Sequence, residues 1–308
     1  MTLVTRQETR LRQARWAGWA TLVANIAIVV TGGAVRLTGS GLGCPTWPRC
    51  TEESFTPHGA LTFHAAIEFG NRLLTFVLVA IAVATFVAAW RTGRRELRRL
   101  ALVLALGIPL QAVIGGITVL VDLNPWAVAL HLMLSMVLVA LAVRFLQQLD
   151  RPVPAVGGPV VALAWGVFAV GFVVLYLGTI VTGSGPHAGD ADVDRNGLDP
   201  VQWSQLHADA VFLYVGMTIG LLAALHATRA DRAAVRATWL LLTLQLAQGA
   251  VGFVQYFTGL PEVLVGIHLL GAGVLAASTT WVLLRVRHPE PVQPPATAAE
   301  PELATSLR

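Results

Sequence analysis

Residues 159–181 read PVVALAWGVFAVGFVVLYLGTIV, a run that contains no charged side chain. An α-helix needs about 20 apolar residues to cross the hydrocarbon core of a bilayer, so this run is long enough to span one. Seven other apolar runs of comparable length occur in the chain. We therefore predict an all-α membrane protein with eight transmembrane helices, at 17–37, 61–90, 100–121, 127–147, 159–181, 203–227, 236–257 and 263–285.

The composition agrees with a membrane protein. Of the 308 residues, 55% are hydrophobic and 12% are charged, and the mean hydropathy is +0.67. These values are far more apolar than those of a soluble domain. The formal net charge is +4, and all 21 basic residues are Arg. Because they lie in short segments between the apolar runs, they indicate contact with membrane lipid and argue against nucleic acid as a partner.

The Arg residues are concentrated at one end of the predicted helices. Most of them lie in the N-terminal segment, in the loops at 91–99, 144–151 and 229–236, and after residue 284. The alternate loops are mainly acidic. By the positive-inside rule, we expect both termini to be cytoplasmic in a bacterial inner membrane. The first apolar run is too long for a signal peptide, and no small-residue cleavage site follows it, so we predict a true span.

The two halves of the chain contain the same pattern. Gln111 lies 20 residues before His131, and Gln248 lies 20 residues before His268. The segment TGSG follows both the first and the fifth apolar run. Four spans return the chain to its starting side, so the halves are predicted to be parallel repeats. Each half is expected to form a four-helix bundle with an interior that can hold a cofactor.

This pattern predicts four segments. The last of them is rich in Pro, Ala, Glu and Thr, a composition typical of disorder. The segments are a cytoplasmic N-tail at 1–16, an N-terminal four-helix bundle at 17–148 with a cysteine-containing loop at 38–60, a C-terminal four-helix bundle at 149–285, and a disordered cytoplasmic tail at 286–308.

Three histidines lie inside predicted spans at matched depth. His131, His207 and His268 occur in the fourth, sixth and eighth apolar runs, each about 6–9 Å inside the outer helix end. Ionisable groups are costly in a bilayer, so they are candidates for function. A single such His is more often a packed, hydrogen-bonded residue than a ligand. Three in one layer, two of them related by the repeat, favour axial ligation of haem iron. Zinc is less suited, because neither half supplies a thiolate or a third imidazole.

The second apolar run carries a polar stripe. His64, Glu68, Asn71 and Arg72 are spaced at i, i+4, i+7 and i+8, which places them on one helical face. We expect His64 and Glu68 at about the depth of the three histidines. Glu68 and Arg72 can be interpreted as a purely structural ion pair. The alternative, which the shared layer favours, is that Glu68 handles protons beside a bound substrate.

Cys44 and Cys50 are the two cysteines of the chain, and both lie in the first outer loop. That compartment is oxidising, so we predict a disulfide between them. The disulfide can act as a structural clip or as a redox-active pair, and the sequence leaves both interpretations open.

These residues resemble those of the haem A synthases, eight-span membrane proteins that complete haem A for terminal oxidases. The resemblance covers nearly all of residues 17–285, and the motifs are specific only in combination. They are Thr38-Gly39-Ser40-Gly41 before the Cys44/Cys50 loop, Ile67-Glu68-Phe69-Gly70-Asn71-Arg72, Ala129-Leu130-His131, Trp203-Ser204-Gln205-Leu206-His207, and His268.

The resemblance implies a division of labour between the halves. The N-terminal half would bind haem O as substrate and oxidise a ring methyl to a formyl group, giving haem A. Glu68 matches the family's carboxylate beside the substrate, and His131 matches a haem ligand of this half. The C-terminal half would hold a haem b cofactor ligated by His207 and His268. Cys44 and Cys50 match the family's loop cysteines.

The chain departs from the family pattern in three ways. Asn71 stands where many members have a second His, so the substrate haem would have His131 alone or use His64 as well. Arg72 follows as in the family. His207 comes one residue earlier than the common spacing after Gln205, which implies that its helix is rotated or locally irregular. The second half has no loop cysteines.

Two other functions fit part of the pattern. A di-haem b-type electron-transfer cytochrome would need the histidines but no methyl oxidation. A quinone-linked thiol oxidase would use Cys44 and Cys50, with the histidines incidental. The sequence leaves open the electron acceptor, delivery of haem O by a haem O synthase, and homo-oligomer formation.

Overall fold

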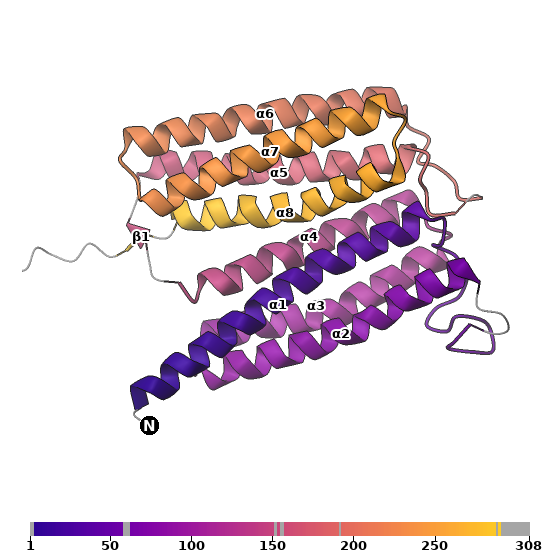
Figure 1. The fold of residues 1–308 in the computed structure, drawn as a ribbon, viewed down its shortest axis with the longest axis horizontal. Helices are drawn as coiled ribbons and strands as arrows, with labels where there is room; N and C mark the ends of the chain where they lie inside the picture. Colours follow the sequence, from indigo (N-terminus) through magenta and orange to yellow (C-terminus); the bar gives the residue numbers. More distant parts are fainter. Residues whose placement is uncertain are drawn as a thin grey trace, which may run out of the picture.

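The computed structural model describes residues 3–57, 62–150, 153–154, 157–190, 192–287 and 289–290. Within these residues the chain folds into eight long helices, each long and apolar enough to cross a membrane (Figure 1). The protein is therefore a multi-pass membrane protein, as predicted. The helices are α1 (Leu3–Leu37), α2 (Phe63–Arg91), α3 (Arg95–Leu120), α4 (Pro125–Gln147), α5 (Gly158–Ser184), α6 (Pro200–Ala227), α7 (Arg232–Phe257) and α8 (Glu262–Arg287).

Polar residues and prolines set the helix starts. Thr62, Asn124, Asp199 and Asp231 are N-cap residues whose side chains accept hydrogen bonds from backbone N–H groups of the first turn. Pro occupies an early position in α4, α5 and α6, where its missing N–H costs nothing. Several helices consequently begin a few residues before the apolar runs that predicted them.

The largest difference from the predicted spans is at α1. The segment 1–16 was expected as a tail, but α1 begins at Leu3 and continues unbroken to Leu37. Arg, Gln and Glu make up seven of the ten residues at 6–15, and they are good helix formers although they are polar. An apolar-run criterion therefore placed the start of the membrane span but not the start of the helix.

Each half of the chain closes a ring of helix contacts. α1 packs on α2 and α4, and α3 packs on the same two helices; α5 and α7 likewise both pack on α6 and α8. Consequently α2 lies across from α4, and α6 lies across from α8. The rings also touch, because α8 packs on α1 and α4, and α5 packs on α4 (Figure 1). The division into two separate bundles at residue 148 stays a prediction.

Ion pairs join the halves at the end that carries the N-terminus. Asp150, which follows α4, accepts hydrogen bonds from Arg15 of α1 at 2.6 Å and from Arg285 of α8 at 2.5 Å. At the opposite end, Arg36 donates to the carbonyls of His187 at 2.5 Å and Thr182 at 2.9 Å. The halves are therefore connected at both membrane surfaces.

Two residue pairs depart from the all-α expectation. Val153–Pro154 (β1) and Pro289–Glu290 (β2) form a parallel pairing in the register Val153 to Pro289 and Pro154 to Glu290. This pairing includes the start of the predicted disordered tail. The rest of that tail, from 291 onward, lies outside the described residues.

Candidate functional site

The three predicted haem ligands lie at matching positions on alternate helices. His131 is six residues after the start of α4, His207 seven after the start of α6, and His268 six after the start of α8. At 1.5 Å per residue, each lies about 9–11 Å inside its helix. The layer predicted for these residues is therefore present.

Each of these imidazoles lies against a glycine of the preceding helix. A Cβ added at Gly115 of α3 would lie 3.1 Å from Cε1 of His131. The corresponding Cε1 distance is 3.3 Å both at Gly178, which faces His207 from α5, and at Gly252, which faces His268 from α7. Larger residues at these positions would displace the rings. The glycines therefore create the space in which the imidazoles stand.

The three rings have one more property in common. The Nδ1 atoms of His131, His207 and His268 are buried, and none has a hydrogen-bond partner among the described residues. The Val174 backbone is close enough to interact with the His207 ring, but no hydrogen bond of acceptable geometry forms at Nδ1. Buried polar atoms normally have partners. Haem iron binds one nitrogen of an imidazole and leaves the other for an acceptor or water, so buried rings that no described side chain engages, on three helices in one layer, fit haem ligation.

Glutamines hold the backbone of two of these histidines. Gln111 Nε2 donates to the His131 carbonyl at 3.2 Å, and Gln248 Nε2 donates to the His268 carbonyl at 2.6 Å. This pair of contacts gives a physical reason for the equal 20-residue spacing in the two halves. It makes Gln111 and Gln248 positioning residues for the histidine layer.

The turns after α3 and α7 also repeat. Leu123 and Leu260 both have a positive φ, of 55° and 60°. Their N–H groups donate to the carbonyls of Thr118 at 2.8 Å and Gln255 at 2.7 Å. Non-glycine residues rarely adopt this conformation. Its occurrence at matched positions shows that the internal repeat extends from sequence to backbone geometry.

In the C-terminal half, two of the histidines lie on opposed helices of the ring. His207 and His268 are within electrostatic reach of each other, on the opposed helices α6 and α8. α6 is continuous from Pro200 to Ala227, so the local irregularity considered from the sequence is absent. The orientation of the whole helix brings His207 onto Gly178.

Among the described residues of the N-terminal half, one imidazole is of this kind, that of His131. Asn71, on the opposed helix α2, lies at the interface with α1, where its Oδ1 accepts a hydrogen bond of 2.8 Å from Thr31. His64 is the second residue of α2 and is exposed, with Nδ1 2.9 Å from the Ser40 hydroxyl. It therefore lies nearer the membrane surface than predicted, because α2 begins at Phe63.

Glu68 and Arg72 form the predicted ion pair beneath the cysteine loop. Glu68 is 5% exposed, and its Oε2 accepts a hydrogen bond of 2.5 Å from the backbone N–H of Cys44. Arg72 donates to the Cys44 carbonyl at 2.8 Å and to the carbonyls of Thr46 and Arg49 at 3.0 and 3.1 Å. Both side chains therefore bind the loop to α2.

The loop itself is closed by the predicted disulfide. Cys44 and Cys50 are bonded, and both are buried. Gly43 lies so close to the backbone of His64 that a Cβ would be 2.6 Å from its carbonyl carbon. The Trp47 ring covers Gly116 of α3. The loop therefore lies across the N-terminal end of α2 and the C-terminal end of α3.

Residues 14–191 match the sequence model of the COX15-CtaA family, described as cytochrome oxidase assembly protein. This match covers more than half of the chain.

The chain belongs to the COX15-CtaA family.

Several curated relatives are similar over most of their length. The chain is 26% identical to a protein of Geobacillus kaustophilus named heme A synthase, over 89% of this chain and 91% of that protein. It is 28% identical to heme A synthase of a Bradyrhizobium strain, with the same two coverages, and 24% identical to heme A synthase of Staphylococcus epidermidis, over 80% and 87%. The family resemblance deduced from the motifs is thus confirmed.

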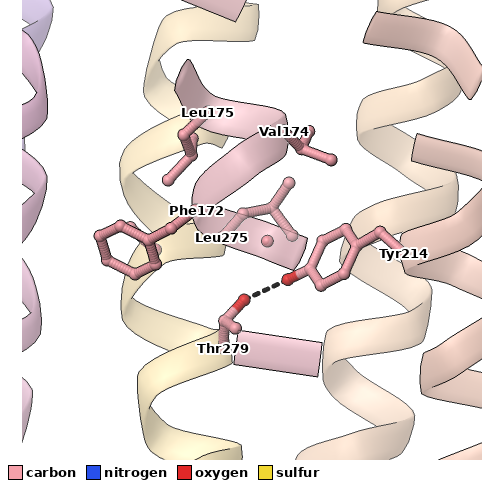
Figure 2. A pocket seen from close by; sticks show the side chains of 8 residues that line it. Phe172, Val174, Leu175, Tyr214, Leu275 and Thr279 are labelled. Atoms are coloured by element: carbon pink, nitrogen blue, oxygen red, sulfur yellow. Dashed lines mark hydrogen bonds between the residues drawn. The ribbon is translucent and has the colours of Figure 1, made fainter. Parts of the chain in front are cut away.

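A second polar group lies deeper in this member of the COX15-CtaA family, two turns from the histidine layer. The Tyr214 hydroxyl of α6 is hydrogen-bonded to Thr279 of α8 beside a small cavity of about 20 Å³ (Figure 2). The Tyr214 ring lies against Gly171, 3.1 Å from where its Cβ would be. Because Gly171 and Gly178 are seven residues apart, as are Tyr214 and His207, one face of α5 accommodates both rings of α6.

Sequence reasoning missed several residues that shape this site. Gly178 and Ser40 had no assigned role, and Gln111 and Gln248 were recognised as a repeat without a function. The aligned glycines Gly115 and Gly252 provided a usable signal, because a small residue at equal spacing before two candidate ligands indicates a close approach of helices.

Proposed function

We propose that this protein is a haem A synthase of a bacterial inner membrane, with both termini cytoplasmic. It would oxidise a ring methyl of haem O to the formyl group of haem A. The observation that carries the proposal is the layer of three buried imidazoles, each standing against a glycine and each with an unpartnered Nδ1. Family membership and relatives named heme A synthase support the choice of substrate.

The C-terminal half is the proposed site of a haem b cofactor. His207 and His268 would hold it, because they lie on the opposed helices α6 and α8 and are within electrostatic reach of each other. When bound, haem b supplies one-electron redox chemistry. Gly178 and Gly252 keep space for the two imidazoles, and Gln248 fixes the backbone that carries His268.

The N-terminal half is the proposed site of haem O. His131 would bind the substrate iron, with Gly115 and Gln111 fixing the position of its ring and backbone. Asn71 offers an amide engaged with Thr31 where a second imidazole would otherwise stand. The substrate iron would then have one protein ligand.

Glu68 is the proposed catalytic residue of this half. Its carboxylate is buried, on the same helix as Asn71 and under the loop that covers the outer end of α2. Oε2 accepts from the Cys44 amide and Oε1 from Arg72, which hold the carboxylate in one position. In this setting Glu68 would accept a proton at a carboxylate oxygen as the methyl group is oxidised. Arg72 positions it and anchors the loop.

Conversion of haem O in cells tests the proposal directly. The chain would be co-expressed with a haem O source in a host that lacks haem A, and extracted haems would be identified by mass. We expect haem A to appear in cells with the wild-type chain and to be absent with His131→Ala. A matched control is His226→Ala, which removes an exposed imidazole at the other end of α6.

The same extraction of haems distinguishes haem A synthesis from the main alternative function. Purified protein that contains haem b alone, in cells that supply haem O, would contradict haem A synthesis and support a di-haem electron-transfer cytochrome. Haem O or haem A together with haem b supports the proposal.

A further inference from the structure

A basic cavity lies at the N-terminal end of α1, far from the histidine layer. Its volume is about 270 Å³, and its lining consists of Arg6, Thr9, Arg10, Gln13 and Arg91. The first four residues belong to α1, and Arg91 is the last residue of α2. The proposed oxidation of haem O makes no use of these residues.

Helical spacing explains why these side chains converge. Arg6, Thr9, Arg10 and Gln13 follow at i, i+3, i+4 and i+7, so they share one face of α1. Glu8 falls on another face. Gln7 Nε2 donates to the Thr92 carbonyl at 3.2 Å, which fastens this part of α1 to the end of α2. Arg91 is thereby brought to the same face.

The three guanidinium groups have no anionic partner among the residues that the structure describes. The ion pairs found there involve Arg15, Arg72 and Arg285 instead. Three neighbouring like charges repel one another unless an anion lies between them. Guanidinium groups bind phosphate oxygens through paired, charge-assisted hydrogen bonds, so phosphate is the anion that this geometry suits.

The depth of the cavity points to lipid as the source of that phosphate. Trp90, one residue before Arg91, is 57% exposed, and Arg98 lies 4.8 Å from its ring. Exposed Trp and Arg at a helix end are typical of the boundary between hydrocarbon and headgroups. The contact between Gln7 and Thr92 places the α1 arginines at this same level.

We propose that Arg6, Arg10 and Arg91 bind the phosphate group of an anionic phospholipid. A lipid with a net negative charge is favoured over a zwitterionic one, because no carboxylate in the cavity would receive an ammonium group. The acyl chains would follow the apolar surfaces of α1 and α2. The site is independent of the proposed haem chemistry.

Native mass spectrometry of the purified full chain tests the site. Protein in detergent would be incubated with equal amounts of phosphatidylglycerol and phosphatidylcholine, and bound lipids counted. We expect the protein to retain one molecule of phosphatidylglycerol in preference to phosphatidylcholine. The variant Arg6→Gln/Arg10→Gln/Arg91→Gln should lose about tenfold or more in affinity. The single variant Arg10→Gln, which alters one exposed side chain, should show a smaller loss in the same direction.

The matched control removes three other exposed arginines at the same end. Arg94→Gln/Arg95→Gln/Arg99→Gln changes the net charge equally but leaves the cavity intact. We expect it to bind phosphatidylglycerol like the wild type. Equal losses in the two triple variants would overturn the proposal in favour of diffuse attraction to the surface. The proposal would also be overturned if the cavity variants bound phosphatidylglycerol with the affinity of the wild type.

A second arm separates lipid from free phosphate. Inorganic phosphate would be added at rising concentration to the protein–phosphatidylglycerol complex. Retention of the lipid at millimolar phosphate supports a phospholipid site, because acyl contacts then add to the headgroup contacts. Complete displacement would overturn the lipid assignment.

Discussion

The backbone N–H of Cys44 donates a hydrogen bond of 2.5 Å to Oε2 of Glu68. The other carboxylate oxygen, Oε1, accepts from Arg72. The two interpretations of Glu68 considered from the sequence are therefore compatible, because the carboxylate is part of a structural ion pair and is also held in a defined position beneath the loop. A substitution that keeps most of these contacts tests the part of Glu68 in the reaction.

Glu68→Gln should retain bound haem and slow the conversion of haem O. The amide keeps an oxygen for one of the two donors but cannot take up a proton at the pH of the cell. A positioned acid–base group contributes about 10²–10⁴-fold to rate, so a decrease of at least about 100-fold is expected. Haem content would be measured by extraction, and conversion by the ratio of haem A to haem O.

The control for this prediction is Glu52→Gln, which removes a carboxylate from the same loop at an exposed position. It should leave conversion unchanged. If Glu68→Gln converts haem O at the wild-type rate, Glu68 has a structural role only.

The Cys44→Ser/Cys50→Ser variant should fold less stably but remain active. The cysteines are six residues apart, and opening so short a loop should lower the free energy of unfolding by about 2 kcal/mol. Arg72 still binds the carbonyls of Cys44 and Thr46, so the loop should stay over α2. Thermal unfolding and haem conversion would be measured on the same preparation. Loss of conversion at full haem content would instead support a redox-active pair.

The fold could be predicted from hydropathy to a large extent, because a chain segment that crosses lipid must hydrogen-bond its own backbone N–H and C=O groups and therefore folds as a helix. Helix ends were less predictable. Polar first turns such as Arg95–Arg99 fold as helix outside the apolar run that marks the span. The opposite occurs at α2, which begins at Phe63, two residues inside the predicted run, and this later start moves His64 out of the predicted layer.

For the candidate site, the sequence could predict only how deep each residue lies along its helix. Counting residues from the helix ends gave the depth of His131, His207 and His268. It could not give the partners of their rings, which depend on how neighbouring helices pack. Contacts made by loops, such as that of the Ser40 hydroxyl with His64, were beyond reach for the same reason.

Gly252→Val should remove haem b by crowding its proposed ligand. A Cβ at this position would already lie 3.3 Å from Cε1 of His268, and the two further methyl groups of Val would crowd the ring more. We expect haem b content to fall at least as far as in His268→Ala, measured as the pyridine haemochrome of purified protein. Gly249→Val is the matched control, because nothing lies within 4 Å of a Cβ there on the same helix. Equal haem b in the two glycine variants, or normal haem b in His268→Ala, would contradict the ligand assignment.

Asn71→His should be tolerated if the substrate pocket is built like that of the family. The new imidazole would lie on α2, across the helix ring from the helix that carries His131, so bound haem O should be retained and should become low-spin in its absorption spectrum. The hydrogen bond from Thr31 to Asn71 is changed as well. Thr31→Val serves as the control, since it removes that bond without adding a ligand. Expulsion of haem O by Asn71→His but not by Thr31→Val would mean that the pocket differs from the expected one.

Asp150→Asn should weaken the connection between the two halves of the chain. Asp150 binds Arg15 of α1 and Arg285 of α8, and its side chain is 14% exposed. Removing its charge leaves two guanidinium groups facing a neutral amide. Because the Arg15 side chain is 44% exposed, solvent screens part of the loss, and we expect about 1–3 kcal/mol of lost stability.

Thermal unfolding of the purified protein would measure this loss of stability, with the exposed Asp194→Asn as control. In a double-mutant cycle, Arg285→Gln should cost less in the Asp150→Asn background than in the wild type. Full additivity would show that the pair does not hold the halves together.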